Sequence, residues 1–229
     1  MEIIYEDNHL IAVNKNCHEI VQGDKTGDTP LAELLKSYLK EKYAKPGNVF
    51  IGVTHRLDRP VSGVVIFAKT GKALIRMNEM FRDGEVKKTY LAITKNRPPL
   101  HEDELTHWLV RNEKQNKSFA CDREKPDSKK ATLYYRLLAQ SEKYFLVEID
   151  LKTGRHHQIR CQLSSIGCPV KGDLKYGADR SNPDGGISLH AYRTSFIHPV
   201  SKEQIVITAH TPPDNLWKAF ETIIKTEKR

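Results

Sequence analysis

The sequence predicts an α+β fold built on a mixed or antiparallel sheet. Roughly eight to ten strand-like segments stand against about four helical ones, and the two kinds do not alternate regularly, which argues against a doubly wound sheet. The chain has 229 residues, enough for one domain with a sizeable core. No Gly/Ser-rich linker, repeat or low-complexity tract divides it. We therefore expect a single domain over residues 1–229.

The chain opens as β structure followed by a helix. Residues 3–14 hold two apolar stretches around a polar Asp-Asn pair, which is typical of a strand, a tight turn and a second strand. Between residues 29 and 44, Leu and Tyr recur at i, i+3, i+4, i+7 and i+8. Asp28 or Thr29 is expected to cap this helix, with Pro30 in its first turn.

A polar segment between two buried strands is the first candidate for a site. The apolar, β-branched runs at 49–53 and 64–68 predict short buried strands, and residues 54–63 between them are rich in His, Arg and Asp. Loops that join strands commonly carry functional groups. A second helix, over residues 72–82, is expected to follow.

The second half of the chain alternates strand-like runs with polar segments. Strands are expected at 88–94, 107–111, 132–139, 145–151, 188–196 and 204–209, and helices at 157–166 and from Asp214 onward. Residues 112–130 carry six Lys or Arg and show no periodicity. They are interpreted either as a solvent-exposed loop or as an arm that contacts a polyanion.

Composition limits the class of protein. With 38% hydrophobic and 29% charged residues the chain is not intrinsically disordered, and no apolar run approaches the about 20 residues of a membrane helix. The acidic N-terminus does not resemble a signal peptide, so a cytoplasmic protein is expected. A net charge of +8 favours a polyanionic partner. Four cysteines without a close CxxC pair indicate reduced thiols, at least two of them buried, rather than a metal site.

Two polar clusters could carry chemistry. In the first, residues 55–63, Asp58 lies between Arg56 and Arg59 and should stay ionised, because nearby positive charge favours the carboxylate. A structural ion pair that caps a turn is the alternative. In the second cluster, residues 152–160, Arg155 could lie over a cleft or merely complete a helix start.

Taken together and in order, these motifs resemble the RluA-type RNA pseudouridine synthases over nearly the whole chain. The matching segments are VNK near the start, HRLDRPVSGVVIFAK, FRDGEVKKTYLAI, LKTGRHHQIRCQL, GCPVKGDLKYG and LHAYRTSFIHPVS. The chain departs from the family pattern at Val61 and His156, where threonine is usual, and at Asn16 and Cys17, where the family commonly has a Pro-containing turn.

The resemblance implies a pseudouridine synthase fold. This fold has a central mixed, largely antiparallel sheet, flanking helices and a basic active-site cleft. The implied chain is the catalytic domain only, without an N-terminal accessory RNA-binding module, and acts as a monomer on a stem-loop of ribosomal RNA, transfer RNA or both. Isomerisation of uridine to pseudouridine changes no redox state, so no cofactor and no metal are expected. If the resemblance holds, residues 112–130 are either an RNA-contacting arm or a solvent-exposed loop.

The resemblance also assigns roles to residues. Asp58 is the implied catalytic carboxylate, which could stabilise positive charge on the sugar, act as nucleophile or remove a sugar proton. Arg155 is expected to pair with it bidentately, and Tyr90 to stack on uracil and assist proton removal. Arg56 corresponds to the arginine that enters the space left by an everted nucleotide, or else binds phosphate.

The remaining implied contacts concern substrate binding. His55 is expected to be structural or to contact RNA, and Leu189 to line the uracil pocket. Lys171, Lys175 and Arg193 are expected to contact phosphates. Two rival functions are a non-catalytic RNA-binding protein on the same scaffold and a metal-dependent hydrolase using His55 with Asp58 or the pair His156 and His157. The latter lacks an HExxH-type ligand helix.

Overall fold

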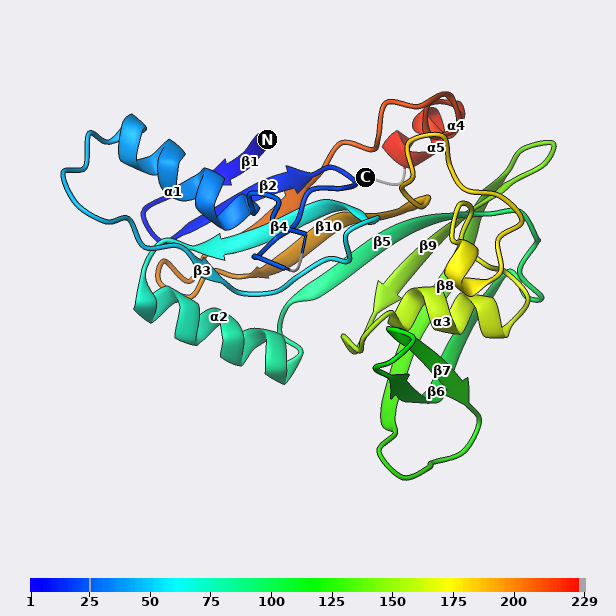
Figure 1. Cartoon of the computed structure of the whole chain (residues 1–229). Helices are drawn as coiled ribbons and strands as arrows, with labels where there is room; N and C mark the ends of the chain where they lie inside the picture. Colours follow the sequence, from blue (N-terminus) through cyan, green and yellow to red (C-terminus); the bar gives the residue numbers. More distant parts are fainter. Residues whose placement is uncertain (25, 227–229) are drawn as a thin grey trace. The chain divides into compact units, whose positions relative to one another are not determined.

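The computed structural model describes residues 1–24 and 26–226, and its secondary structure is the predicted α+β mixture (Figure 1). The chain forms two compact units. Unit 1 comprises Met1–Lys87 and Tyr192–His210, and unit 2 comprises Lys88–Ala191 together with the residues from Thr211 onward. The expected single catalytic domain stays a prediction.

Unit 1 is built on antiparallel strands. Its strands are β1 (Glu2–Glu6), β2 (Leu10–Lys15), β3 (Gly52–Val53), β4 (Ser62–Ala68), most of β10 (Leu189–Ile197) and β11 (Gln204–Thr208). They lie in the order β1-β2-β4-β10, with β3 beside β4 and β11 beside β10. The predicted strand, turn and strand at residues 3–14 are confirmed by the antiparallel β1–β2 pair.

Two helices cover the two faces of the unit 1 sheet, α1 (Leu31–Lys42) and α2 (Gly71–Asp83). Side chains of β2 and β4 alternate between the faces, so Ile11 and Phe67 pack with Leu35 of α1. Leu10 and Ile66 pack with Met77 of α2 on the other face. Burial on both sides explains the continuous apolar runs at residues 10–13 of β2 and 64–68 of β4.

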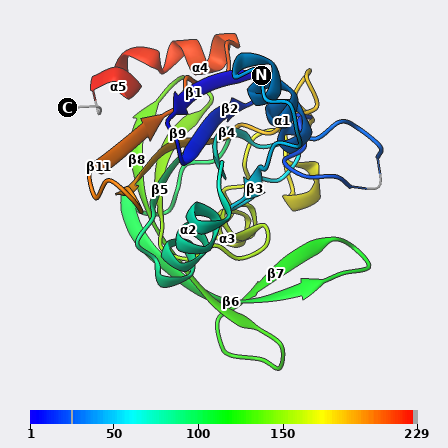
Figure 2. The ribbon, with the colours of Figure 1, turned by 90° about the vertical axis from the view of Figure 1, so that its left-hand side faces the viewer.

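Unit 2 contains a second set of antiparallel strands and the short C-terminal helices. The strands are β5 (Lys87–Thr94), β6 (Glu102–Asn112), β7 (Lys117–Cys121), β8 (Lys129–Gln140) and β9 (Phe145–Leu151), in the order β5-β9-β8-β6-β7. Figure 2 shows the β6–β7 hairpin extending from this sheet. The helices are α3 (Gln158–Ser165), the 3-10 turn η1 (Leu174–Tyr176), α4 (Asn215–Ala219) and α5 (Glu221–Thr226).

The structure corrects two local expectations. Residues 112–130 are not an aperiodic loop, because Lys117–Cys121 forms β7 and pairs with β6 from Trp108 to Asn112. The sequence pattern hid this strand because its buried face carries the polar Ser118, which is 2% exposed, whereas the apolar Phe119 on the opposite face is 42% exposed. At helix α1 the N-cap is Pro30, with no side-chain cap, rather than Asp28 or Thr29.

Other expectations are confirmed. The helix expected over residues 72–82 is α2, and the helix expected from Asp214 onward begins with α4, where the Asp214 side chain accepts from the N–H groups of Leu216 and Trp217. Cys161 and Cys168 are buried and free, and burial raises the pKa of each thiol to about 11. A separate observation is that none of the helices within the described part of the chain has the length and apolar character of a membrane-spanning segment.

Candidate active site

Asp58 lies half-buried on the turn between β3 and β4 in unit 1. The beginning of the turn is fixed to the middle of β4: the Thr54 hydroxyl donates to the Ile66 carbonyl at 2.6 Å, and the Ile66 N–H donates to His55 Nε2 at 3.1 Å. The His55 ring also lies 4.7 Å from that of Phe81. The geometry therefore gives His55 a structural contact with β4 and α2.

The end of the turn is held by a buried ammonium. Lys15, the last residue of β2, is 0% exposed, and its Nζ donates to the carbonyls of Asn16, Arg59 and Val61 at 2.9, 3.0 and 2.6 Å. The Val61 N–H donates to the Asp58 carbonyl, so the ammonium fixes the backbone directly after the aspartate. Burial lowers the pKa of Lys15 to about 8, opposed by negative groups that include Asp58.

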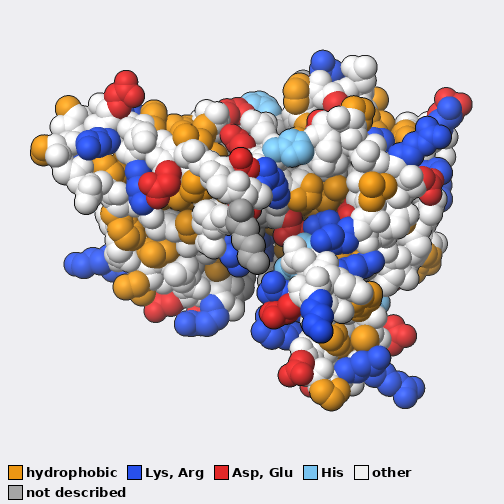
Figure 3. All heavy atoms as spheres, in the orientation of Figure 1, with side chains coloured by type: hydrophobic (Ala, Val, Ile, Leu, Met, Phe, Trp, Pro, Cys, Tyr) orange, Lys and Arg blue, Asp and Glu red, His pale blue; other side chains and the backbone are white. Residues whose placement is uncertain are grey.

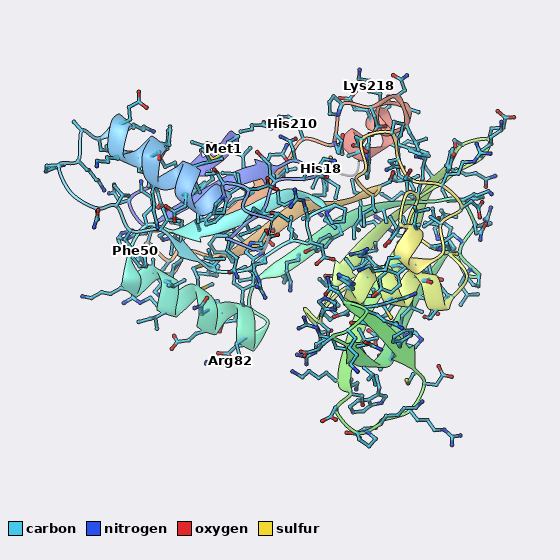
Figure 4. The ribbon with its side chains drawn as sticks, viewed as in Figure 1. Met1, His18, Phe50, Arg82, His210 and Lys218 are labelled. Atoms are coloured by element: carbon cyan, nitrogen blue, oxygen red, sulfur yellow. The ribbon has the colours of Figure 1, made fainter. Side chains whose placement is uncertain are left out.

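The two arginines beside Asp58 have different environments. Arg59 forms ion pairs with Asp24 and Asp28, and its guanidinium donates to Thr26 at 3.0 Å. Its backbone carbonyl accepts from the N–H of His18, a residue labelled in Figure 4 in the segment after β2. Arg56 is exposed. Arg59 thus ties the turn to residues 24–28, whereas Arg56 presents its side chain at the surface.

Backbone conformation at the turn explains one glycine of the motif. Gly63 pairs with Lys15 at the start of β4 and has φ +116°, a region that favours glycine. Val61 and Ser62, which precede it, are buried. The departure from threonine at Val61 therefore places an apolar side chain in a buried position.

Tyr90 and Leu189 lie on neighbouring backbone segments of unit 2. Tyr90 is 8% exposed, sits on β5 and faces Ile149 of β9 in the register. The Ile93 N–H donates to the Ser188 carbonyl at 2.9 Å, which joins β5 to the segment leading into Leu189. Arg193, farther along β10, belongs to unit 1 and is half-buried.

Arg155 lies on a turn that a buried glutamine organises. Gln158 is 3% exposed, and its Oε1 accepts from the Thr153 hydroxyl at 2.8 Å and from the Arg155 N–H at 3.0 Å. Its Nε2 donates to the Thr132 carbonyl of β8 at 3.1 Å. The Arg155 side chain is exposed, and its Nε donates to the Lys130 carbonyl at 3.0 Å. The turn is therefore attached to β8 through both Gln158 and Arg155.

The expected phosphate contacts Lys171 and Lys175 both make contacts within unit 2. Lys175 Nζ donates to the carbonyl of Asn116 at 3.0 Å, which places it against the end of the β6–β7 hairpin. Lys171 Nζ donates to Asn182 Oδ1 at 2.6 Å and borders a cavity of about 530 Å³. The structure thus gives Lys175 a part in holding the hairpin.

His156, the second departure from the family pattern, also contacts the hairpin. Its Nδ1 lies 2.9 Å from the Ser118 hydroxyl, and its Nε2 lies 3.2 Å from Asn116 Oδ1. Its ring stacks on that of His157 at 3.8 Å. Figure 3 shows Lys and Arg side chains on the surface of this hairpin. The substitution of histidine for threonine therefore links the Arg155 turn to a basic hairpin.

A buried ion pair joins two further motifs. Arg160 of α3 donates from Nε and Nη2 to the carboxylate of Asp173 at 2.7 and 2.9 Å, and both side chains are nearly inaccessible. The pair connects the HQIR segment with the GDLKYG segment. Such a bidentate pair fixes geometry because the guanidinium is planar.

Sequence reasoning missed the residues that hold the turns. Lys15, Gln158, Arg160 and Asp173 are polar side chains inside segments quoted for the family resemblance, and all four are buried. A lysine at the end of an apolar strand and a glutamine at the start of a helix give no signal of burial by themselves. Among the described residues, no group of three or more His, Cys, Asp or Glu is arranged to hold a metal.

Comparison with known proteins decides the family. The family model described as RNA pseudouridylate synthase matches residues 9–165, which include both the Asp58 turn and the Arg155 turn. The chain belongs to the RNA pseudouridylate synthase family. It is thus an isomerase that converts uridine to pseudouridine in RNA, and the curated relatives place it with the RluA-type enzymes.

The relatives cover most of the chain. It is 31% identical over 224 residues to ribosomal large subunit pseudouridine synthase D of Zymomonas mobilis, a match that covers 93% of this chain and 70% of the relative. It is 28% identical to tRNA pseudouridine synthase C of Vibrio parahaemolyticus, a match that covers 97% of this chain and 94% of the relative.

Solved structures support the fold. Human RNA pseudouridylate synthase domain containing 4 superposes with a TM-score of 0.79 at 22% identity, covering 97% of this chain and 93% of that one. Human RNA pseudouridylate synthase domain containing 1 gives a TM-score of 0.67 at 21% identity. The expected pseudouridine synthase fold is therefore confirmed.

Proposed function

We propose that this enzyme isomerises specific uridines in ribosomal RNA, transfer RNA or both, with Asp58 as the catalytic carboxylate. The observation that carries the proposal is the continuous family match over residues 9–165, which contains the Asp58, Tyr90 and Arg155 motifs in order. Relatives of similar identity are named for large-subunit ribosomal RNA and for transfer RNA. Both RNA classes are therefore candidate substrates.

The proposed reaction requires a carboxylate beside the sugar. The bond between uracil N1 and the anomeric carbon breaks, the base turns, and the ring carbon C5 bonds to the same sugar carbon with loss of its proton. Asp58 acts at the anomeric position, as nucleophile, as base toward a sugar proton or as stabiliser of positive charge. The support is its place on a turn whose backbone is fixed by the Lys15 ammonium and by the contacts of Thr54.

Arg155 and Tyr90 complete the proposed catalytic set. Arg155 orients the Asp58 carboxylate through two parallel N–H donors, for which a guanidinium is suited and an ammonium is not. Its Nε is already bound to the Lys130 carbonyl, which leaves the terminal nitrogens to meet the carboxylate. Tyr90 stacks on the uracil ring and assists removal of the C5 proton, and Leu189 lines the pocket.

RNA binding is assigned to basic side chains. Arg56 enters the space left by the everted nucleotide, consistent with its exposed side chain. Lys171 and Arg193 contact phosphates, and the basic β6–β7 hairpin is the RNA-contacting arm, held in place by Lys175 and His156. His55 supports the Asp58 turn. We further propose that the enzyme acts in the cytoplasm as a monomer.

The test of this function is a map of pseudouridines in total RNA. RNA from cells with and without the gene is compared, and the gene is restored as a matched control. The proposal predicts one or more ribosomal or transfer RNA uridines whose modification disappears with the gene and returns with it. Identical maps with and without the gene would contradict it.

A further inference from the structure

Lys88 places a cation beside the proposed uracil site. It lies on β5 two residues before Tyr90 and is half-buried. Among the side chains that the structure describes, its ammonium makes no hydrogen bond and no ion pair, and its electrostatic partner is the Asp150 carboxylate. A charge removed from water without a compensating acceptor is costly. The lysine is therefore placed for an acceptor that arrives with a ligand.

The geometry places this ammonium against the Arg155 turn. Lys88 Nζ lies 3.5 Å from the position that a Cβ atom would take at Gly154, the residue before Arg155. A side chain at position 154 would therefore contact the ammonium. Glycine at this position keeps the space around the charged group open.

Lys88 and Tyr90 project from the same face of β5, because alternate residues of a strand share a face and are about 6.6 Å apart. Ile149, which faces Tyr90 on β9, is completely buried, so this face is apolar next to the tyrosine. Burial lowers the pKa of Lys88, and the nearby Asp150 carboxylate opposes that effect. Asp150 itself forms an ion pair with Lys152.

We propose that Lys88 is a further catalytic residue, which donates a hydrogen bond to a carbonyl oxygen of uracil and stabilises the base while it is detached from the sugar. This inference rests on the proposed stacking of uracil on Tyr90. A base on that ring has its edge within reach of the four-carbon lysine stem.

The chemistry of the step calls for a cation at this place. When the bond from N1 to the anomeric carbon breaks, its electron pair stays on N1, and the negative charge spreads over O2 and O4. The ammonium keeps its proton and stabilises this charge. The attraction between the two charges is stronger in an apolar environment than in water. When C5 bonds to the anomeric carbon and its proton leaves, the base becomes neutral again and the interaction weakens.

The experiment compares Lys88→Met with Lys87→Met, a matched control that removes an exposed lysine from the adjacent position of the same strand. The substrate is a synthetic oligonucleotide spanning a uridine found by the pseudouridine map. Single-turnover conversion at saturating RNA is expected to fall about 100-fold in Lys88→Met, as for the loss of one donor to a developing anion. The single-turnover rate of the Lys87→Met control is expected to stay within about threefold of the wild-type rate.

Further measurements separate this role from two others. A phosphate contact would raise the Kd and reduce the salt slope by about one while leaving the saturated rate unchanged, and that result would overturn the proposal. A lower urea midpoint for Lys88→Met would also overturn it, because it would reveal a stabilising partner within the protein. We expect an unchanged Kd and an unchanged or higher midpoint.

The most specific test changes single atoms of the substrate. Sulfur accepts hydrogen bonds weakly, so a 2-thio or 4-thio target uridine should slow the wild-type enzyme by about tenfold and leave Lys88→Met nearly unaffected. Equal slowing of both enzymes, or no slowing of either with both thio substrates, would refute the contact. Failure of the wild type to modify the unsubstituted oligonucleotide would instead contradict the proposed function.

Discussion

Replacing Lys15 with methionine tests whether a buried ammonium positions the Asp58 turn. The substitution keeps most of the side-chain volume but removes the ammonium from the carbonyls of Asn16 and Val61, whereas the Arg59 carbonyl keeps the N–H of His18 as a donor. Each buried carbonyl without a partner costs about 1–3 kcal/mol. The substitution also removes the free-energy cost of burying the charge of Lys15. The lowering of the Lys15 pKa from 10.5 to about 8 corresponds to a cost of about 3 kcal/mol. With two carbonyls left without this donor, the net loss of unfolding free energy at pH 7 should be about 1 kcal/mol.

The sign of the pH dependence follows from the lowered pKa. Below pH 8 the lysine is charged in both the folded and the unfolded state, so the full burial cost is present. Between pH 8 and 10.5 the folded protein releases the proton first, and the cost disappears as the pH rises. The unfolding free energy of the wild type should therefore rise by about 3 kcal/mol relative to that of Lys15→Met across this pH interval.

Urea unfolding of both proteins at several pH values measures this difference. Groups such as Cys161 and Tyr176, whose pKa burial also raises, titrate in both proteins and cancel in the comparison. Lys36→Met, at an exposed ion pair with Glu33, is the control and should change stability by less than about 1 kcal/mol. A stability gap between wild type and Lys15→Met that narrows with rising pH would refute the reasoning.

Three further substitutions test the Arg155 turn and its support. Arg155→Lys should slow single-turnover conversion at least tenfold at unchanged stability, because bidentate orientation of a carboxylate is lost; an unchanged rate would reject that role. Gln158→Leu should lose about 2–3 kcal/mol in urea unfolding and also slow turnover, and full activity at saturating RNA would show that the turn needs no such support. Arg160→Met should lose about 3–5 kcal/mol by stranding Asp173, whereas adding Asp173→Leu should recover part of it; no recovery would contradict the pairing.

Much of the fold could be predicted from the sequence because its strands are buried on both sides. The runs at residues 10–13 and 62–68 are continuously apolar or small because α1 and α2 cover opposite faces of the sheet. Strand β7 was missed for the opposite reason: it belongs to a hairpin with exposed side chains such as Phe119, and its residues carry no apolar alternation.

The candidate site was predicted from ordered motifs, but its supports were not. The positions of Asp58, Tyr90 and Arg155 follow from the family pattern, whereas two of the three carbonyls that Lys15 binds, those of Arg59 and Val61, belong to residues distant along the chain. Backbone acceptors have no signature in a sequence. The same holds for Lys88, whose unusual feature is that its ammonium makes no hydrogen bond or ion pair with the described side chains.

The central claim is that Asp58 carries the isomerisation, and Asp58→Asn tests it most directly. Asparagine preserves the side-chain size while removing the negative charge. Pseudouridine formation on the mapped target RNA is measured under single-turnover conditions for the variant and the wild type, with RNA affinity and urea unfolding measured alongside. The account predicts that the variant folds and binds RNA normally but forms no pseudouridine. A conversion rate within tenfold of the wild type would contradict it.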